Sequence, residues 1–360
     1  MPDVSIVVPR LDSKPWGGRT LSRYGFELPP DVPIGEALVT AGDAGISDGY
    51  GVGRTLGDVV AEDPATRLGE LATAAVSGRE IFPLLVKLID AAENLSIQVH
   101  PNDAQAESLD RLGKTEAWHV LAAEPGAKLY IGIDPATSLD AFAEAARKLD
   151  GTSATLMRAV DAVPGETILI PAGTVHALGA GVMVYEIQQP SDVTFRLDDW
   201  GRVDAQGNPR EMHLDQGFAV ARPELLPAYL TPIALDSEVG SRKLLVATRY
   251  FGLERVELAH GEVIELPVVA TSPQVVTAIA GSVTVSGGTS GGTLQPGHSA
   301  VIWPNAGGFV AIRANEDATI LRSWVPDLAT EIIAPARAAG ADDEAIAAIG
   351  EPAGDIRAAL

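Results

Sequence analysis

Short apolar runs separated by Gly and Pro fill the middle of the chain. Six of them follow at close spacing: LSIQVH (95–100), AWHVLAA (117–123), AKLYIGI (127–133), ETILIPAG (166–173), VMVYEIQQ (182–189) and VTFRLDDW (193–200). Runs of this length, bounded by turn residues, are typical of antiparallel sandwich or barrel strands and not of βαβ units. The pattern therefore predicts a mainly β protein with a few peripheral helices.

A second β-rich block begins near residue 242 and runs to about 325. Its clearest strands lie in 242–258, 272–288 and 319–324, and GGTSGG at 287–292 predicts a hairpin tip. Helical patterns are few and predict helices at 63–74, 102–112, 138–149 and 211–225, with a helical Ala-rich tail after about residue 330.

One internal similarity links the two blocks. Pro-Gly-Glu-Thr-Ile-Leu-Ile-Pro at 164–171 is echoed by Pro-Gly-His-Ser-Ala-Val-Ile-Trp-Pro at 296–304. A Pro-Gly turn that feeds an apolar strand ending at another Pro is a pattern that a small barrel repeats in each copy. We therefore expect two related antiparallel β-barrels in tandem. The predicted units are a catalytic barrel over 1–235, a second barrel over 236–328 and a helical tail over 329–360.

Composition and charge narrow the function. The 360 residues include 26 Lys and Arg against 48 Asp and Glu, for a formal charge of −22. Such an acidic chain disfavours nucleic acid and anionic membrane surfaces as partners. The longest apolar run, 81–89, contains Lys87 and is far short of the ~20 residues of a membrane span. The chain also has no Cys and no recognisable secretory signal, so we expect a cytoplasmic protein, monomeric or homodimeric.

Four residues of the first block form a candidate metal site. Gln98 and His100 share one face of a strand by period-2 alternation, and His176 follows a rigid Pro-x-Gly turn. Glu116 lies between them in the sequence. Two imidazoles, a carboxylate and an amide oxygen suit Zn²⁺ or another divalent first-row ion and leave room for water or substrate. The second block has Ala-Gly-Gly where the first has Thr-Val-His, so any metal is expected in the first barrel alone.

The other histidines lack a donor-rich context, and we expect structural or surface roles for them: His119, His213, His260 and His298. Three further residues are candidates for chemistry. Arg196 offers a planar cation to oxygen-rich ligands, and Glu186 is a candidate proton carrier. Lys87, set in an apolar run, needs a partner or a ligand, although a lysine that extends to solvent at a strand edge is an equal alternative.

These motifs, in this order, resemble type I mannose-6-phosphate isomerase in its shorter bacterial form, a family of the cupin superfamily. The residues that carry the resemblance are Lys-Pro-Trp-Gly-Gly at 14–18, Phe-Pro-Leu-Leu-Val-Lys at 82–87, Leu-Ser-Ile-Gln-Val-His-Pro at 95–101, Lys-Thr-Glu at 114–116, Pro-Ala-Gly-Thr-Val-His-Ala-Leu-Gly at 171–179 and the segment 186–196. They cover about residues 1–220. Lys-Thr-Glu stands where many members have Lys-Pro-Glu, and the long helical insertion of larger members is missing.

The resemblance implies two cupin-type jelly-roll barrels and one Zn²⁺ per chain, with Gln98, His100, Glu116 and His176 as ligands. It implies interconversion of mannose 6-phosphate and fructose 6-phosphate through a cis-enediol. Catalytic roles then fall to Arg196, Glu186 and Lys114, and Ser96 and Lys87 lie around the sugar phosphate. Glu186 and a water on the metal are the two candidates for the proton carrier.

Three alternatives stay open at the level of sequence. An isomerase of an unphosphorylated sugar would use the same residues. A non-catalytic sugar-binding cupin would keep the pocket without turnover. A cupin-like metal oxidase or dioxygenase would use a similar His/His/Glu set with iron, and its activity would depend on oxygen.

Overall fold

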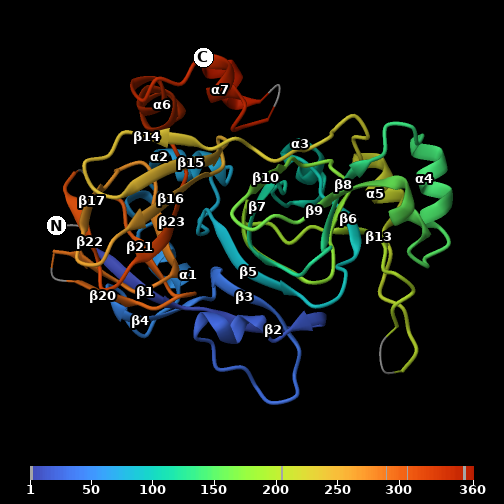
Figure 1. Ribbon diagram of the computed structural model, residues 1–360, viewed down its shortest axis with the longest axis horizontal. Coiled ribbons are helices and arrows are strands. Elements are labelled where there is room, and N and C mark those ends of the chain that lie inside the picture. Colours follow the sequence, from blue (N-terminus) through green and yellow to red (C-terminus); the bar gives the residue numbers. More distant parts are fainter. Residues whose placement is uncertain (1–2, 204–205, 289, 306, 352–353) are drawn as a thin grey trace.

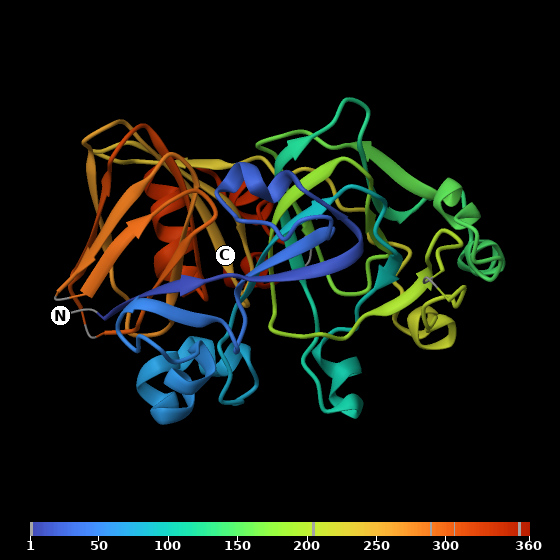
Figure 2. The same ribbon diagram turned by 90° about the horizontal axis from the view of Figure 1, so that it is seen from below.

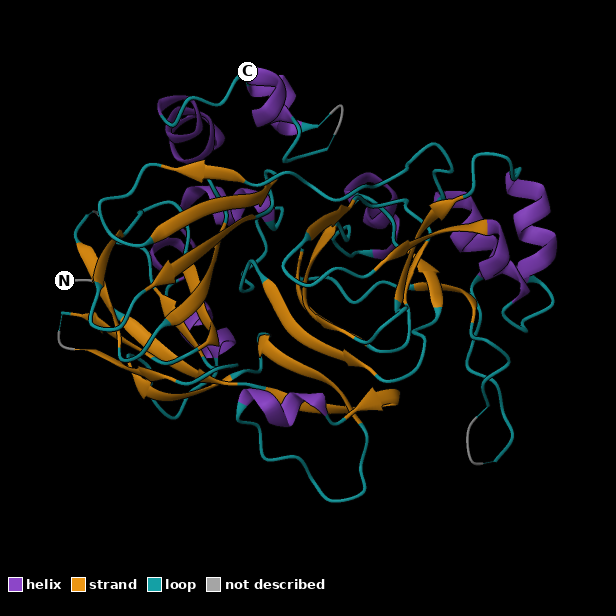
Figure 3. Ribbon diagram, viewed as in Figure 1, coloured by secondary structure: helices purple, strands orange, loops and turns teal. Residues whose placement is uncertain are grey.

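The protein, seen as a computed structural model, is described over residues 3–203, 206–288, 290–305, 307–351 and 354–360. Two lobes built from antiparallel strands lie side by side, with short helices at the periphery (Figure 1, Figure 3). The predicted mainly β fold is confirmed. No helix within the described ranges has the length and hydropathy that a bilayer span requires.

Each lobe contains one large and one smaller sheet, and no sheet's strand order closes on itself. The first lobe has a six-stranded sheet, in the order β10 (Thr167–Ile170), β7 (Glu116–Ala123), β12 (Val182–Gln188), β5 (Leu85–Ala91), β2 (Arg10–Gly18) and β3 (Ile34–Thr40). Its second sheet has the order β13 (Phe195–Asp198), β6 (Ile97–Val99), β11 (His176–Leu178), β8 (Lys128–Ile133) and β9 (Met157–Asp161).

The second lobe has an eight-stranded sheet, in the order β14 (Ile233–Leu235), β15 (Ser241–Ala247), β16 (Gly252–Leu258), β23 (Ala318–Trp324), β18 (Gln274–Ala280), β21 (Ser299–Ile302), β1 (Val4–Val8) and β4 (Gly45–Gly49). Its four-stranded sheet has the order β17 (Val263–Pro267), β22 (Phe309–Ala314), β19 (Val283–Gly287) and β20 (Ser290–Leu294). β19 and β20 pair as the predicted hairpin, and residue 289 at its tip lies outside the described ranges.

The two lobes share one strand topology. The order β10-β7-β12-β5 in the first large sheet recurs as β21-β18-β23-β16 in the second, and β6-β11-β8-β9 recurs as β17-β22-β19-β20. Each of these eight strands of the first lobe is thus matched by the strand eleven places later. The repeated Pro-Gly turns precede β10 and β21, and Gly165 and Gly297 both adopt a left-handed φ, of 88° and 84°. This is the conformation that favours glycine.

The N-terminal strands join the lobes. β1 pairs with β21, with Val4 opposite Ile302, and β4 pairs with the other edge of β1. The chain therefore begins in the sheet of the second lobe, although the sequence assigns residues 1–235 to the first unit (Figure 2). The division at 235 and 328 stays a prediction for the rest of the chain.

The helices are short. They are α1 (Leu56–Glu62), α2 (Pro64–Ala75), α3 (Asp103–Ala106), α4 (Leu139–Ala146), α5 (Leu214–Val220), α6 (Ala334–Ala338), α7 (Asp343–Ala347) and α8 (Asp355–Ala359), with 3-10 turns η1 (Thr20–Tyr24), η2 (Glu107–Leu109) and η3 (Thr152–Leu156) and a π-helical turn η4 (Leu328–Ile333). The predictions for 63–74 and 138–149 correspond to α2 and α4, and Ser138 caps the N-terminus of α4 by accepting from the backbone N–H of Ala141.

Two helix predictions were too long. The segment 102–112 holds only α3 and η2, since the chain turns into a left-handed conformation at Asp110, with φ 52°. The segment 211–225 contains α5 alone, because Ala221 is already extended and Pro223 has no N–H to continue the helix.

The core between the lobes explains why so many strands are apolar on both faces. Inside each lobe, one face of the large sheet packs against the smaller sheet. The other faces of the two large sheets meet in a shared core that holds Tyr185 from β12 and Leu321 from β23. The Tyr185 hydroxyl also hydrogen-bonds with Ser323 Oγ at 2.9 Å. The large sheet of the first lobe, which carries Glu116 of the candidate metal site, is therefore packed on both faces.

Trp303 lies in this shared core, and its substitution tests how much the core stabilises the protein. It is fully buried, meets Phe82 edge to face, and its indole N–H donates to Ser5 Oγ on β1 at 2.7 Å. We expect Trp303→Ala to lower the free energy of unfolding by about 3–5 kcal/mol, measured by urea denaturation. The exposed Phe309 is the control, and Phe309→Ala should change it by less than about 0.5 kcal/mol. Equal effects of the two variants on the free energy of unfolding would contradict the assignment of Trp303 to the stabilising core.

His119 predicts how stability depends on pH. It lies on the side of β7 away from Glu116, beside Thr167, and burial together with Arg255 lowers its pKa to about 4. Because the folded state favours the neutral form, its contribution of about 3 kcal/mol is complete above pH ~6.5 and is lost as the pH falls to ~4. Urea denaturation of His119→Gln should lose this part of the pH dependence, whereas the exposed His260→Gln should keep it. If the pH dependence of stability were unchanged in His119→Gln, its assignment to His119 would be wrong.

Candidate active site

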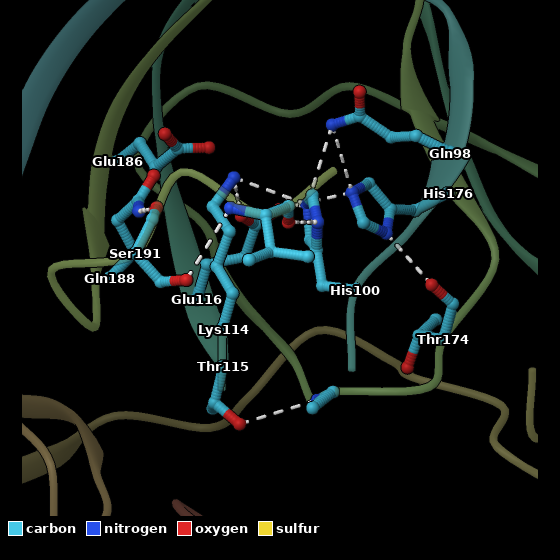
Figure 4. Close-up of polar contacts among 12 residues, drawn as sticks. Gln98, His100, Lys114, Thr115, Glu116, Thr174, His176, Glu186, Gln188 and Ser191 are labelled. Atoms are coloured by element: carbon cyan, nitrogen blue, oxygen red, sulfur yellow. Dashed lines mark hydrogen bonds and ion pairs between the residues drawn. The ribbon is translucent and has the colours of Figure 1, made fainter. Parts of the chain in front are cut away.

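Antiparallel pairing brings the predicted metal ligands onto the inner face of the first lobe. His176, the first residue of β11, lies opposite Gln98 on β6, and Gln98 lies opposite Arg196 on β13. Directly opposite residues of an antiparallel pair point to the same face of the sheet. His100 follows β6 two residues after Gln98, and Glu116 begins β7 in the facing sheet. The four side chains converge between the two sheets (Figure 4).

Backbone carbonyls orient both imidazoles. His100 Nδ1 lies 2.8 Å from Val193 O, and His176 Nδ1 lies 2.8 Å from Thr174 O. Since a carbonyl can only accept, each Nδ1 carries the proton, and each Nε2 presents a lone pair to the centre. Figure 4 shows the two rings turned toward one another with their Nε2 atoms inside the cluster. This is the tautomer that a metal-binding imidazole needs.

The donor atoms lie close enough for one ion. His176 Nε2 is 3.1 Å from Glu116 Oε1, and His100 Nε2 is 3.6 Å from Oε2. Ligand atoms of these three residues all lie within 4.8 Å of one another, the one such group of His, Asp and Glu side chains in the described ranges. The described residues of the second lobe contain no second group of this kind.

Glu116 shows that the site fits a cation. Its side chain is fully buried, and neither carboxylate oxygen makes a hydrogen bond of normal geometry with the described residues, although Lys114 Nζ and His176 Nε2 each lie 3.1 Å away. A buried carboxylate in that state is costly unless a cation compensates it. Burial alone would raise the pKa of Glu116, but Lys114, His176 and His100 together lower it well below its usual range. The group is ionised and available as a ligand.

Gln98 completes the set through its amide. Its Nε2 lies 3.3 Å from His176 Nε2 and 3.5 Å from that of His100, while Oε1 accepts from Ser96 Oγ at 3.2 Å. Amide oxygen and nitrogen exchange places by a 180° turn of the group. The turned amide offers its oxygen to the centre and its NH₂ to the Ser96 hydroxyl, which can accept as well as donate.

Lys114 lies against the ligands. Its Nζ is 3.1 Å from both Glu116 Oε2 and His100 Nε2, and the side chain is almost completely buried. Burial and the charge of Lys114 lower the pKa of His100 well below its usual range. The imidazole is therefore neutral, which is the form that binds a metal.

A second charged pair lies beside the cluster. Lys87 on β5 is opposite Glu186 on β12, and Lys87 Nζ lies 3.3 Å from Glu186 Oε2. The other oxygen, Oε1, accepts from the indole N–H of Trp118 at 2.9 Å. Burial opposes the charge of Lys87, but Glu186 and Glu36 raise its pKa above its usual value. Lys87 is thus a partnered cation in the interior of the lobe, not a chain that extends to solvent.

Arg196 lies on β13, in the same sheet as Gln98 and His176, and its guanidinium group contacts the segment that precedes α5. Its Nη1 donates to Glu211 O at 2.8 Å, and its Nε is buried and makes no hydrogen bond with the described residues. His213, expected to be structural, contacts the backbone N–H of Arg196 through Nδ1. The buried Nε leaves a donor for a ligand.

Sequence reasoning missed the partners that hold these groups. The carbonyls of Thr174 and Val193 carry no side-chain signal. Alternation from Glu116 does place Trp118 on the same face of an extended segment, but it gives no sign of the hydrogen bond from the Trp118 indole to Glu186. The sequence also showed no basic cluster, yet buried Asp199 binds the guanidinium groups of Arg202 and Arg210 near Arg196.

Known proteins that this chain resembles in sequence are phosphomannose isomerases. The family model of the phosphomannose isomerase type I catalytic domain matches residues 6–124. Mannose-6-phosphate isomerase ManA of Bacillus subtilis is 34% identical over 257 residues, which cover 70% of this chain and 78% of the relative.

Solved structures agree as well. The crystal structure of the mannose 6-phosphate isomerase from Bacillus subtilis superposes with a TM-score of 0.75 at 26% identity, covering 90% of this chain and 99% of that one. A zinc-bound mannose 6-phosphate isomerase shares the fold with a TM-score of 0.68 at 18% identity, over 89% and 99% of the two chains. The sequence match over most of both chains shows that this protein belongs to the type I phosphomannose isomerase family, whose members are also called mannose-6-phosphate isomerases.

Proposed function

We propose that the protein is a zinc-dependent isomerase that interconverts mannose 6-phosphate and fructose 6-phosphate. The observation that carries the proposal is the buried, ionised Glu116, whose oxygens face two imidazole lone pairs beside Lys114. The names of the relatives support the reaction, and the zinc-bound neighbour supports the metal.

Zinc would be held by Gln98, His100, Glu116 and His176. When bound, it supplies a Lewis acid that polarises the oxygens of the sugar carbon that reacts. The protein supplies the rest. The neutral tautomers of both histidines are fixed by backbone carbonyls, and Ser96 holds the amide of Gln98. The ligand set is thus formed before a metal or substrate arrives.

The reaction moves a proton between C2 and C1 of the open-chain sugar. A base takes the C2 proton of the aldose, the cis-enediol forms, and the proton is returned to C1 as the hydroxyl proton passes from O2 to O1. We assign the carbon-bound proton to Glu186. Its carboxylate is held on one oxygen by Trp118 and lies 3.3 Å from Lys87 on the other. Such a fixed carboxylate is a suitable general base.

The cations take the remaining roles. Lys114, next to the ligands, is placed to stabilise the negative charge that develops on the enediolate oxygens. The unpartnered Nε of Arg196 serves an anionic oxygen of the substrate in the same way. Lys87, and Ser96 at the edge of the ligand set, are proposed to contact sugar or phosphate oxygens. In a chain of charge −22, these cations form the local positive site that an anionic substrate needs.

The finer architecture belongs to the same proposal. We propose that each pair of sheets is a cupin-type jelly-roll barrel, supported by the identical strand order of the two lobes. We also propose that the enzyme acts in the cytoplasm as a monomer or homodimer, since its substrate is a soluble metabolite and its sequence contains no Cys. Retention of Lys114, Glu186 and Arg196 beside the ligand set favours catalysis over a non-catalytic sugar-binding role.

Metal removal tests the reaction. Purified protein should form fructose 6-phosphate from mannose 6-phosphate in a coupled assay, lose this activity after chelation and regain it with Zn²⁺. The physical reason is that Glu116 and the two imidazoles converge on one centre, where the neighbouring Lys114 ammonium cannot supply the Lewis acidity of a metal ion. Turnover of free mannose alone would support an isomerase of unphosphorylated sugars, and turnover that requires oxygen would support an oxidase. A folded, zinc-loaded protein without any turnover would overturn the proposed function.

Variants separate metal binding from chemistry. Glu116→Gln and His176→Ala should lose bound zinc and lower activity by more than about 100-fold, since even outer partners of a metal site cost about 10- to 100-fold. Arg196→Ala should keep its zinc and lose about 100- to 1,000-fold in kcat, as for other donors to developing charge. Zinc content by mass spectrometry and initial rates are the measurements, with exposed His260→Ala as control. Full activity in metal-free His176→Ala would refute the assignment.

A further inference from the structure

The second lobe keeps a polar cluster at the position that corresponds to the active site. The repeated motifs fix the correspondence. Ile170 at the end of β10 lies opposite Glu116, and Ile302 at the end of β21 lies opposite Gln274. Gln274 is therefore the counterpart of Glu116 in the second lobe.

The neighbours of Gln274 are charged. In the first lobe, Glu186 on β12 faces Lys87 on β5, and the matching strands of the second lobe place Arg322 on β23 opposite Glu254 on β16. Arg322 Nη1 lies 3.2 Å from Glu254 Oε2, and its Nε donates to Gln274 Oε1 at 2.7 Å. The ion pair is retained at the same place with the two charges exchanged.

The rest of this interior is apolar. β17 and β22, which match the strands of Gln98 and His176, contribute aliphatic side chains to the core, such as Leu266 and Ile312. A purely structural interior could be apolar throughout, and replacing a buried ion pair by apolar groups is often neutral or stabilising. The charged cluster is therefore a feature that needs a reason.

A cavity of about 180 Å³ lies against this cluster. The C-terminal segment covers it with Glu331 of η4 and with Pro335 and Ala338 of α6. Figure 1 shows α6 above β14 and β15 at that end of the second lobe. The space exceeds the roughly 10–15 Å³ that one water needs and is below the ~300 Å³ of sites for drug-sized ligands.

The lining has hydrogen-bonding groups to spare. Trp324 is 1% exposed, and its indole N–H makes no hydrogen bond of normal geometry with the described residues. The nearest acceptor is Glu331, whose pKa is raised by burial and lowered in part by this N–H. Arg322 lies 4.0 Å over the Trp324 ring and holds the ring in place. Arg242 contacts Glu254 through Nε, and its terminal nitrogens make no hydrogen bond with any residue in the described ranges.

The charge of the lining selects the ligand class. Two arginines, Arg242 and Arg322, are balanced by the carboxylates of Glu254, Glu331 and Asp236, so the cavity offers no net positive charge to a phosphate. The lining instead offers both donors, from Trp324 and the two arginines, and acceptors, from the carboxylates. Hydroxyl groups, which accept from the indole and guanidinium N–H groups and donate to carboxylates, match such a lining.

We propose that this cavity is a second binding site, for a small neutral polyol, under the C-terminal segment of the second lobe. It takes no part in the isomerisation and does not depend on the proposed reaction. In the site, Trp324 donates to one hydroxyl oxygen and Glu331 accepts from another hydroxyl group.

Fluorine NMR of the full-length protein labelled with 5-fluorotryptophan tests the proposal. The chain has five Trp residues, and Trp324→Phe assigns the reporter signal. Titration with D-mannitol should shift the Trp324 signal in a saturable manner and leave that of Trp118, beside Glu186, in place. Glu331→Gln should weaken this binding about tenfold, as for the loss of a hydrogen bond to a charged group. The exposed Glu316→Gln is the matched control and should bind like the parent.

Saturation-transfer NMR of mannitol provides a second measurement, in which Trp324→Phe should lose the signal while the isomerase activity and melting temperature stay near those of the parent. A Trp324 signal that does not move, or moves without saturating, overturns the proposal. So does a shift confined to Trp118, which would place the polyol in the first lobe alone, and so does equal affinity in Glu331→Gln and Glu316→Gln.

Discussion

Strand register is the constraint on which the site depends. A strand repeats every two residues, so a slip of one position turns every side chain to the other face of its sheet. In β6 such a slip would send Gln98 out of the lobe and bring Val99 in. The pairing of His176 with Gln98, and of Glu186 with both Lys87 and Trp118, exists only in the observed register. The metal ligands and the charged pair thus depend on the registers of the two sheets that face each other in the first lobe.

That register is held by apolar packing on both sides of the large sheets. The first large sheet buries one face in its own lobe and the other against the second lobe, so a slip would expose apolar side chains on either side. This support lets the lobe tolerate the buried carboxylates of Glu116 and Glu186 and the charges of buried Lys114 and largely buried Lys87. Lys114 and Lys87 each have a carboxylate within hydrogen-bonding range, and Glu116 faces two imidazoles. The second lobe therefore acts as the rigid backing of the active site.

The sequence predicted more of the site than of the fold's long-range order. Alternation placed Gln98 and His100 on one face of a strand, because this signal is local, whereas their meeting with Glu116 and His176 depends on the pairing of distant strands. The Pro-Gly repeat predicted the duplication, and the shared strand order agrees with it. Pairing of β1 with β21 joins positions almost 300 residues apart, as in Val4 opposite Ile302, and no local pattern encodes it. The helix predictions failed where a single residue, such as left-handed Asp110, ended a favourable pattern.

The two lobes show which parts of a duplicated site depend on one another. Gln98 and His176 lie on β6 and β11, whose counterparts β17 and β22 contribute apolar side chains to the core of the second lobe. Ligands of one ion are useful only as a set, so these polar positions depend on one another. The charged pair follows a different rule. Removing one partner of a buried pair leaves an uncompensated charge, whereas exchanging both charges preserves the pairing. Glu254 and Arg322 stand where Lys87 and Glu186 stand in the first lobe, with the charges exchanged, so the requirement retained at this place is for a paired polar group, independent of the metal chemistry beside it.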